Sequence, residues 1–228
     1  MLIAHRDELL RRLPDDARLL DVGGWAAPME RADAVIDLMP FETRGLYGPS
    51  DPARERFTAE TWVQRDICDR EPWPFADDEF DFVVCSHTLE DIRDPVWVCE
   101  EIRRVGRAGY LEFPSRLEEH CHAIDGPWTG WNHHRWLCEA DREAGAVTFT
   151  FKYAMLEMEQ FRFEKWFWEG LSEEQRRDWL WWEQSFEVAE RVHMDPTALF
   201  QEMDAFVRAH RDLVAAPRRR ALRRRLDS

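Results

Sequence analysis

Five short apolar runs in the first half of the chain constrain its fold most, because they alternate with polar, helical or loop-like segments. They cover residues 18–22, 34–38, 61–65, 80–85 and 108–113. The run at 80–85 is apolar enough for a strand that is buried on both faces, as strands of parallel sheets are. Short strands interleaved in this way predict an α/β fold around a mostly parallel sheet.

Helix and loop signals lie between these strands. Residues 5–13 predict a short amphipathic helix, which Pro14 closes. Asp94 and Pro95 open a helix that runs to about residue 105, because aspartate caps helix N-termini and proline at the first helical position loses no hydrogen bond. Residues 39–60 are rich in glycine and proline and predict an irregular loop.

The second half of the chain follows a different pattern. Residues 135–138 and 146–153 predict an antiparallel hairpin with a polar turn around Gly145. Beyond residue 160 the spacing favours helices, since Ser172 and Gln175 can form a capping box and a last helix follows residue 195.

These patterns divide the chain into one main domain with additions. We predict a ligand-binding domain over residues 1–155, in which residues 115–135 form a loop on the substrate side. A Trp-rich helical elaboration is expected over residues 156–216, followed by a basic tail over 217–228. The tail holds six arginines and one aspartate, and we expect it to be a solvated end of the chain.

Charge and cysteine usage narrow the possible partners. A net charge of −15 argues against nonspecific nucleic-acid binding by the body of the protein. There is no apolar run of the about 20 residues that span a bilayer, and the first residues are too charged for a signal peptide. Five cysteines without a CxxC pair indicate buried free thiols. We expect a cytoplasmic protein with no membrane partner; its oligomeric state stays open.

The end of the first strand is the first candidate binding site. Open α/β sheets bind ligands at the carboxyl ends of their strands, and here Asp21 is followed closely by Gly23 and Gly24. The GxGxxG spacing of dinucleotide sites is absent, and a carboxylate suits an ammonium group better than a phosphate. Asp37 ends the second strand, where it can accept hydrogen bonds from two ribose hydroxyls. The alternative is that the glycines form a tight turn and both aspartates cap strand ends.

Three segments resemble class I S-adenosylmethionine-dependent methyltransferases, especially the small-molecule group called methyltransferase type 11. Residues 19–24 look like the first nucleoside-binding motif, and residues 62–81 resemble the adenine-binding segment. Residues 85–95 resemble the end of the fourth strand and the next helix. The resemblance implies a Rossmann-like class I methyltransferase sheet, mostly parallel with an antiparallel C-terminal hairpin, and S-adenosylmethionine as cofactor.

The resemblance also assigns residues to parts of the cofactor. Asp21, Gly23 and Gly24 are assigned to the methionine end, and Asp37 is assigned to the ribose. Asp66 and Ile67 are assigned to the adenine, and Ser86 is assigned to the sulfonium. Two departures from the family stand out. Trp25 occupies a position that is usually glycine, and Asp91 stands where many relatives have histidine.

Methyl transfer is a displacement at a sulfonium carbon, so catalysis is mostly alignment, plus removal of a proton from the acceptor. Histidine is the usual base at neutral pH. His133 and His134 lie on the insert after the fifth strand, and we expect one of them to be the base or to orient the acceptor. His87, at the end of the fourth strand, is the second choice. The alternative is that these histidines only hold loop backbone.

Trp128 and Trp131 lie on the same Gly-containing loop and are candidates for a lid over the acceptor. The histidines and acids of this insert offer enough ligands for a metal ion. Their spacing matches no closed zinc pattern, however, and we expect no metal.

The sequence thus predicts an S-adenosylmethionine-dependent methyltransferase that acts on a hydroxyl or amine of a small molecule in biosynthetic metabolism. One alternative keeps the cofactor but uses the sulfonium for another reaction, such as cyclisation. A second alternative is a non-catalytic scaffold with a degenerate site. Formation of S-adenosylhomocysteine would distinguish the first hypothesis from the other two.

Overall fold

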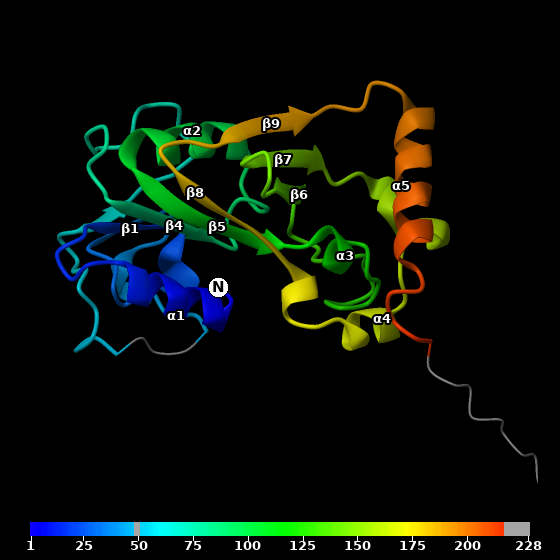
Figure 1. Ribbon diagram of the computed structural model, residues 1–228, viewed down its shortest axis with the longest axis horizontal. Helices are drawn as coiled ribbons and strands as arrows, with labels where there is room; N and C mark the ends of the chain where they lie inside the picture. The colour runs from blue at the N-terminus through cyan, green and yellow to red at the C-terminus, as the bar shows by residue number, and fades with distance from the viewer. Residues whose placement is uncertain (48–50, 217–228) are drawn as a thin grey trace, which may run out of the picture.

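A six-stranded sheet forms the centre of the protein. The computed structural model describes residues 1–47 and 51–216 (Figure 1), so the predicted basic tail lies outside the described residues. The strand order is β3-β2-β1-β4-β5-β8. The strands are β1 (Leu19–Val22), β2 (Ala34–Asp37), β3 (Trp62–Gln64), β4 (Phe82–Ser86), β5 (Ala108–Pro114) and β8 (Arg177–Glu183). The first five run parallel and β8 pairs antiparallel with β5, which confirms the predicted mostly parallel α/β sheet.

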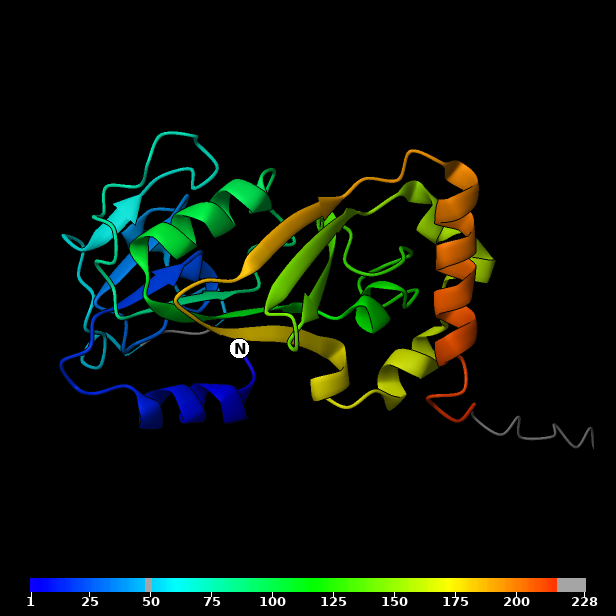
Figure 2. The ribbon, with the colours of Figure 1, turned by 45° about the horizontal axis from the view of Figure 1, so that its top comes forward.

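The two faces of this sheet are covered by different helices (Figure 2). Leu20 and Val83 belong to the core on one face, together with the buried side of α2 (Pro95–Val105). Leu19 and Val84 belong to the core on the other face, with α1 (Ile3–Arg12). Asp94 caps α2 as predicted, because its carboxylate accepts the backbone N–H of Trp97 at 3.1 Å.

Short connections replace helices elsewhere around the sheet. Only the 3₁₀ turn η1 (Gly24–Ala26) lies between β1 and β2, and η2 (Phe41–Thr43) is the one helical turn described between β2 and β3. The carboxyl ends of β1 and β2 are therefore bordered by loop backbone. The side chains that face this edge are positioned by loops and not by long helices.

A second sheet has the order β6-β7-β9 and consists of β6 (Trp136–Asp141), β7 (Ala146–Phe151) and β9 (Glu187–Arg191). The predicted antiparallel pair is confirmed in β6 and β7, and β9 runs parallel to β7. The remaining elements are α3 (Arg116–Glu119), η3 (Ala154–Glu157), η4 (Glu159–Phe161), α4 (Lys165–Gly170), η5 (Glu174–Arg176) and α5 (Pro196–His210). Cys138 and Phe149 pack into the same core as α2, so the second sheet lies against that face.

The predicted helical elaboration over residues 156–216 is wrong for residues 177–191, which form β8 and β9. The exposure alternates along β8, because Leu180 and Trp182 are buried whereas Trp179 and Trp181 are half-buried on the other face. Trp181 packs there on Tyr110 of β5, with ring centroids 4.5 Å apart. This strand completes the first sheet.

All five cysteines are buried and free, as predicted from their apolar settings. Among residues 1–47 and 51–216, no helix is both long and apolar enough to cross a lipid bilayer.

Candidate active site

Asp37 lies at the carboxyl end of β2 with both carboxylate oxygens turned to loop backbone. One oxygen accepts the N–H of Trp25 at 2.9 Å and the other accepts the N–H of Met39 at 2.8 Å. Burial raises the pKa of Asp37, and the backbone hydrogen bonds oppose that shift. A carboxylate offers about four acceptor positions, and the backbone N–H groups of Met39, Trp25 and Leu38 act on this one. The acceptor capacity that remains fits a ribose hydroxyl of the cofactor that the resemblance implies.

Asp21 has a different environment at the end of β1. It is 4% exposed and accepts the N–H of Met29 at 2.8 Å. Burial raises the pKa of Asp21 to about 7. A Cβ atom on Gly24 would lie 2.4 Å from its carboxylate, so the loop needs glycine where it passes over this side chain. Asp21 therefore supports the loop, and its contact with the methionine end stays a prediction.

Gly23 is constrained by its backbone as well as by its neighbour. Its φ is +73°, a region that favours glycine, and a Cβ atom there would lie 2.2 Å from Oγ1 of Thr88. The tight-turn interpretation of the two glycines is thus correct in geometry. It does not conflict with a binding role, since the same turn keeps loop backbone close to the strand ends.

The residues assigned to the adenine and the sulfonium also have internal partners. Asp66 accepts the N–H of Cys68 at 2.9 Å and forms an ion pair with Arg93. Ile67 is buried at this edge, and the hydroxyl of Ser86 donates to Glu112 at 3.4 Å. These contacts position the three residues at the ends of β3 and β4 but test none of their predicted roles.

His87 follows β4 and lies between two buried carboxylates. Its Nε2 is 3.2 Å from Glu112 and its Nδ1 is 3.4 Å from Glu90. Burial alone would lower the pKa of His87, but the two carboxylates outweigh burial and the net shift is upward. A carboxylate near each nitrogen favours the doubly protonated ring, which has no lone pair for a further proton, so this geometry disfavours His87 as the base.

Glu112 connects His87 to the N-terminal segment. This fully buried carboxylate of β5 also accepts the Tyr110 hydroxyl at 2.5 Å and the Leu2 N–H at 2.8 Å. Burial by itself would raise the pKa of Glu112, yet these donors and His87 hold it well below its usual range. Glu112 was not among the residues predicted from the sequence, although a charged residue inside an apolar predicted strand is a signal that could have found it.

His133 and His134 differ sharply in their surroundings. The side chain of His134 is 6% exposed and that of His133 is 60% exposed. The Nδ1 atom of His134 is 2.6 Å from Oε1 of Glu119, and Nζ of Lys152 is 2.7 Å from the other oxygen of Glu119. An Nδ1–H that donates to Glu119 leaves the lone pair on Nε2. Burial alone would lower the pKa of His134, but Glu119 shifts it upward.

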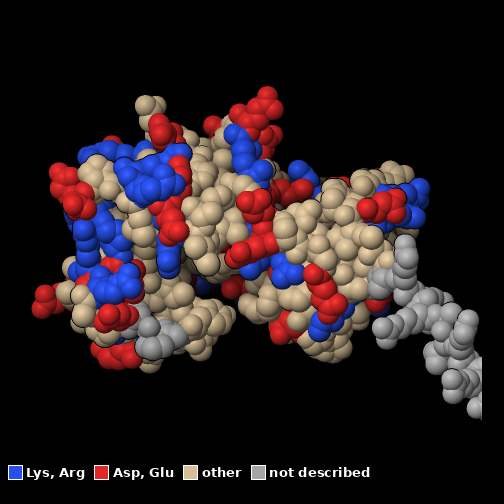
Figure 3. Space-filling model, turned by 60° about the horizontal axis from the view of Figure 1, so that its bottom comes forward, with Lys and Arg blue, Asp and Glu red and all other residues tan. Residues whose placement is uncertain are grey.

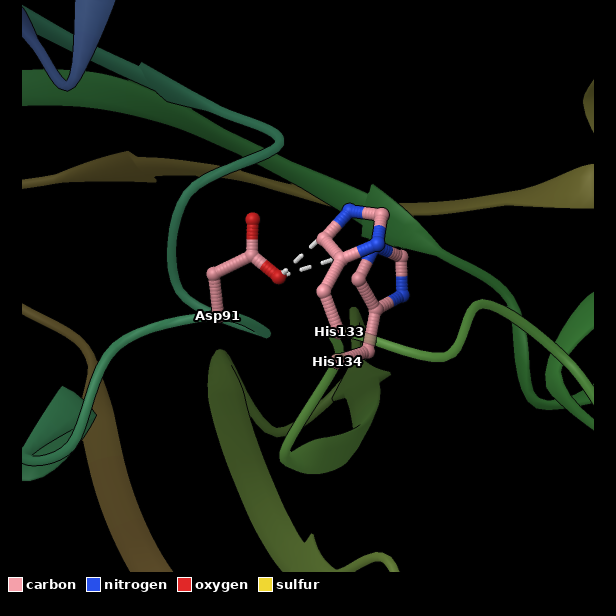
Figure 4. A group of neighbouring side chains, drawn as sticks. All are labelled: Asp91, His133 and His134. Atoms are coloured by element: carbon pink, nitrogen blue, oxygen red, sulfur yellow. Dashed lines mark ion pairs between the residues drawn. The ribbon is translucent and has the colours of Figure 1, made fainter. Parts of the chain in front are cut away.

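The free side of this histidine pair faces Asp91 (Figure 4). Oδ1 of Asp91 lies 3.7 Å from Nε2 of His134 and 3.9 Å from Nε2 of His133. In the described part of the chain, Oδ1 of Asp91 and both carboxylate oxygens of the buried Glu90 have no hydrogen-bond partner. The structure thus unites residues from the end of β4 with the insert, a combination that sequence spacing did not indicate.

The two candidate lid residues are placed differently. Trp131 lies beside the pair, with its ring centroid 6.0 Å from that of His134, and its carbonyl accepts a hydrogen bond from Lys152 at 2.7 Å. Trp128 is 46% exposed. Trp131 therefore lies beside His134, and the lid role of both tryptophans stays a prediction.

One surface cleft lies away from this site. It lies at the opposite edge of the sheet, near the amino ends of β4 and β5, and its lining includes Phe82, Ala108 and Trp181. The polar groups predicted to bind the cofactor lie at the other edge, at the carboxyl ends of the strands.

Comparison with known protein families gives a match to part of the chain. Residues 49–111 match a family model described as a methyltransferase domain. These residues contain β3, β4 and α2 and most of β5. No curated protein sequence matches the chain.

One solved structure that resembles this chain is the YcgJ protein of Bacillus subtilis, at 20% identity and a TM-score of 0.38. The match covers 49% of this chain and 51% of that chain. An S-adenosylmethionine-dependent methyltransferase of Mesorhizobium loti shares 17% identity over 64% of this chain and 63% of its own, with a TM-score of 0.36. This chain spans about half the length of several of the solved proteins that it matches. At these TM-scores the similarities carry no argument about the acceptor.

Proposed function

We propose that this chain, which carries an S-adenosylmethionine-dependent methyltransferase domain of class I fold, methylates a hydroxyl or an amine of a small molecule. The observation that supports this most is the hydrogen bond between Glu119 and Nδ1 of His134, at 2.6 Å. A histidine whose second nitrogen is free and whose first is held by a carboxylate is the usual arrangement of a general base.

The cofactor supplies a methyl group on a sulfonium, which is already a good leaving group. Asp37 would hold the ribose, through the acceptor capacity that its backbone hydrogen bonds from Trp25 and Met39 leave. Burial makes such hydrogen bonds stronger than they are at a solvent-exposed carboxylate. Asp37 thereby fixes the position of the cofactor relative to β4.

On the acceptor side, Nε2 of His134 takes the proton that a hydroxyl loses as it attacks, or that an ammonium loses to become the attacking amine. The imidazolium that forms is stabilised by Glu119, whose charge is balanced by Lys152 at 2.7 Å. Trp131 provides an aromatic surface next to the ring and excludes water from it. His87 acts differently, as a fixed cation between Glu90 and Glu112 that keeps the end of β4 in place.

A small acceptor also agrees with the charge of the molecule. The chain carries a net charge of −15, which repels nucleic acid. On the face of the molecule in Figure 3, basic side chains alternate with acidic ones. We therefore propose a small-molecule partner, without nucleic acid or membrane, in a cytoplasmic setting.

The experiment that tests this function is turnover of S-adenosylmethionine with pools of small hydroxyl and amine compounds. We expect S-adenosylhomocysteine together with a methylated product in equal amounts. A product that forms without S-adenosylhomocysteine would favour a different use of the sulfonium, such as cyclisation. Tight cofactor binding with no turnover across the pools would favour a non-catalytic scaffold.

A further inference from the structure

Three metal-ligating side chains meet between the end of β4 and the turn before β6 (Figure 4). Their ligand atoms all lie within 4.8 Å of one another, and they belong to Asp91, His133 and His134. We propose that these three residues bind one divalent transition-metal ion, and that this ion competes with the acceptor proton for Nε2 of His134.

The distances are close to those of a coordinated ion. Oδ1 of Asp91 lies 3.7 Å from Nε2 of His134 and 3.9 Å from Nε2 of His133. In tetrahedral zinc sites with bonds of about 2.0–2.1 Å, ligand atoms are roughly 3.3 Å apart. The two distances to Asp91 would have to shorten by about 0.4–0.6 Å, and the third distance, between the two imidazole nitrogens, is within 4.8 Å. His133 is 60% exposed on a turn and is free to make that shift.

The surroundings of the cluster resemble those of a metal centre. A metal-bound histidine almost always donates its other N–H to a carboxylate or carbonyl, which orients the ring. Glu119 takes this position on His134 at 2.6 Å, with Lys152 balancing its charge. This contact leaves Nε2 of His134 directed toward Asp91.

A second observation concerns Asp91 itself. Its Oδ1 atom is buried and has no hydrogen-bond partner among residues 1–47 and 51–216. An unsatisfied buried acceptor is costly, and it faces the imidazoles here across the space that an ion would fill. A bound cation satisfies this oxygen and both imidazoles at once.

The donor set also selects the kind of ion. Two imidazoles and one carboxylate suit zinc, cobalt, nickel or copper, and leave coordination positions open to water. Magnesium and calcium prefer oxygen ligands and bind poorly to such a set. No metal was expected from the sequence, because only the spacing of ligands within the insert was considered. Asp91, the residue that completes the cluster, follows β4 and lies outside that insert.

The consequence for catalysis follows from the single lone pair on Nε2 of His134. A nitrogen that coordinates an ion cannot take the acceptor proton, so the loaded protein loses its base. This consequence rests on the proposed function, whereas ion binding does not. An excess of zinc should therefore inhibit methyl transfer, and a chelator should restore it.

Ion binding is tested on the full chain by titration with Co²⁺, followed by visible absorption, and with Zn²⁺ by calorimetry. We expect one ion per chain and no binding of Mg²⁺. Asp91→Asn and His133→Ala should each weaken Zn²⁺ at least about 10-fold, and Glu119→Gln should weaken it roughly 10–100-fold. His210→Ala, at the end of α5, is the matched control histidine and should bind as the wild type does.

Because His133 is exposed, we expect His133→Ala to fold as the wild type does, and circular dichroism would check this. Absence of saturable Co²⁺ binding, or unchanged affinity in both Asp91→Asn and His133→Ala, would overturn the metal site. Stimulation of methyl transfer by Zn²⁺ would overturn the competition for Nε2. If no acceptor is methylated at all, the proposed function fails, and the Co²⁺ titration still decides the metal site.

Discussion

Glu119 accepts a hydrogen bond from Nδ1 of His134 at 2.6 Å, and this contact ties the short helix α3 to the turn before β6. It also distinguishes His134 from the adjacent His133, since the sequence alone made both of them candidate bases. His134 is held in the protein with Nε2 directed toward Asp91, whereas His133 is largely exposed. Two of the predictions below, Glu119→Gln and the comparison of His134→Ala with His133→Ala, test this contact directly.

Glu119→Gln should lower kcat roughly 10–100-fold with little change in KM for the acceptor. Glutamine still accepts the N–H of His134 but no longer stabilises the imidazolium that forms in the transition state. Steady-state kinetics measures the effect, with the exposed Glu143→Gln as control. A rise in KM with unchanged kcat would show that Glu119 shapes the acceptor site without acting through His134.

Asp37→Ala should weaken S-adenosylmethionine about 10–100-fold, because a hydrogen bond to a charged group contributes roughly 1.5–3 kcal/mol. Calorimetry with the purified chain measures the affinity. Glu71→Ala is a suitable control, since the Glu71 side chain is 92% exposed. Equal affinities in the two variants would remove Asp37 from the ribose.

Gly24→Ala should destabilise the fold by about 1–3 kcal/mol, as overpacking does. The added Cβ would lie 2.4 Å from the Asp21 carboxylate and disturb its hydrogen bond to Met29. Denaturant unfolding measures the change. Gly145→Ala, where a Cβ meets no atom within 4 Å, reports backbone strain alone. A smaller loss in Gly24→Ala than in Gly145→Ala would contradict the packing described at the first strand end.

His87→Asn should destabilise the protein more at pH 6 than at pH 9. The pKa of His87 is raised in the folded state by Glu112 and Glu90, so its stabilising charge is fully present below the unfolded pKa of about 6.5. That contribution disappears as the pH rises through the folded pKa.

Asparagine suits this test because His87 has a φ of 56°, and asparagine tolerates the left-handed region. The loss of charge is then separated from backbone strain. Thermal unfolding of both proteins across the pH range gives the difference in Tm. A difference that is the same at pH 6 and pH 9 would show that the ring is not held as a cation.

The first five strands of the sheet were predictable because each is a local apolar run bounded by turn residues. β8 was not, because Trp179, Leu180, Trp181 and Trp182 are all large and apolar, and such a run does not distinguish a strand from a helix. Its identity depends on pairing with β5, some seventy residues earlier in the chain, where Leu111 lies opposite Leu180. β9 likewise depends on its pairing with β7.

The candidate site was predictable only in part, for a similar reason. The location of Asp37 and of the histidine insert followed from strand ends and from the family resemblance. The partners that give His134 its orientation and His87 its charge could not be found in this way. Glu119, Glu112 and Lys152 reach the site from α3, β5 and the end of β7, and only the folded chain brings them together.

The most direct test of the account compares His134→Ala with His133→Ala in kcat and in affinity for S-adenosylmethionine, with a chelator present to keep metal ions off the site. A base that takes the acceptor proton contributes typically 10²–10⁴ in rate. We predict that His134→Ala loses at least about 100-fold in kcat while binding the cofactor within a few-fold of the wild type, and that His133→Ala loses little. Comparable, mild losses in the two variants would contradict the account and assign both histidines to loop structure.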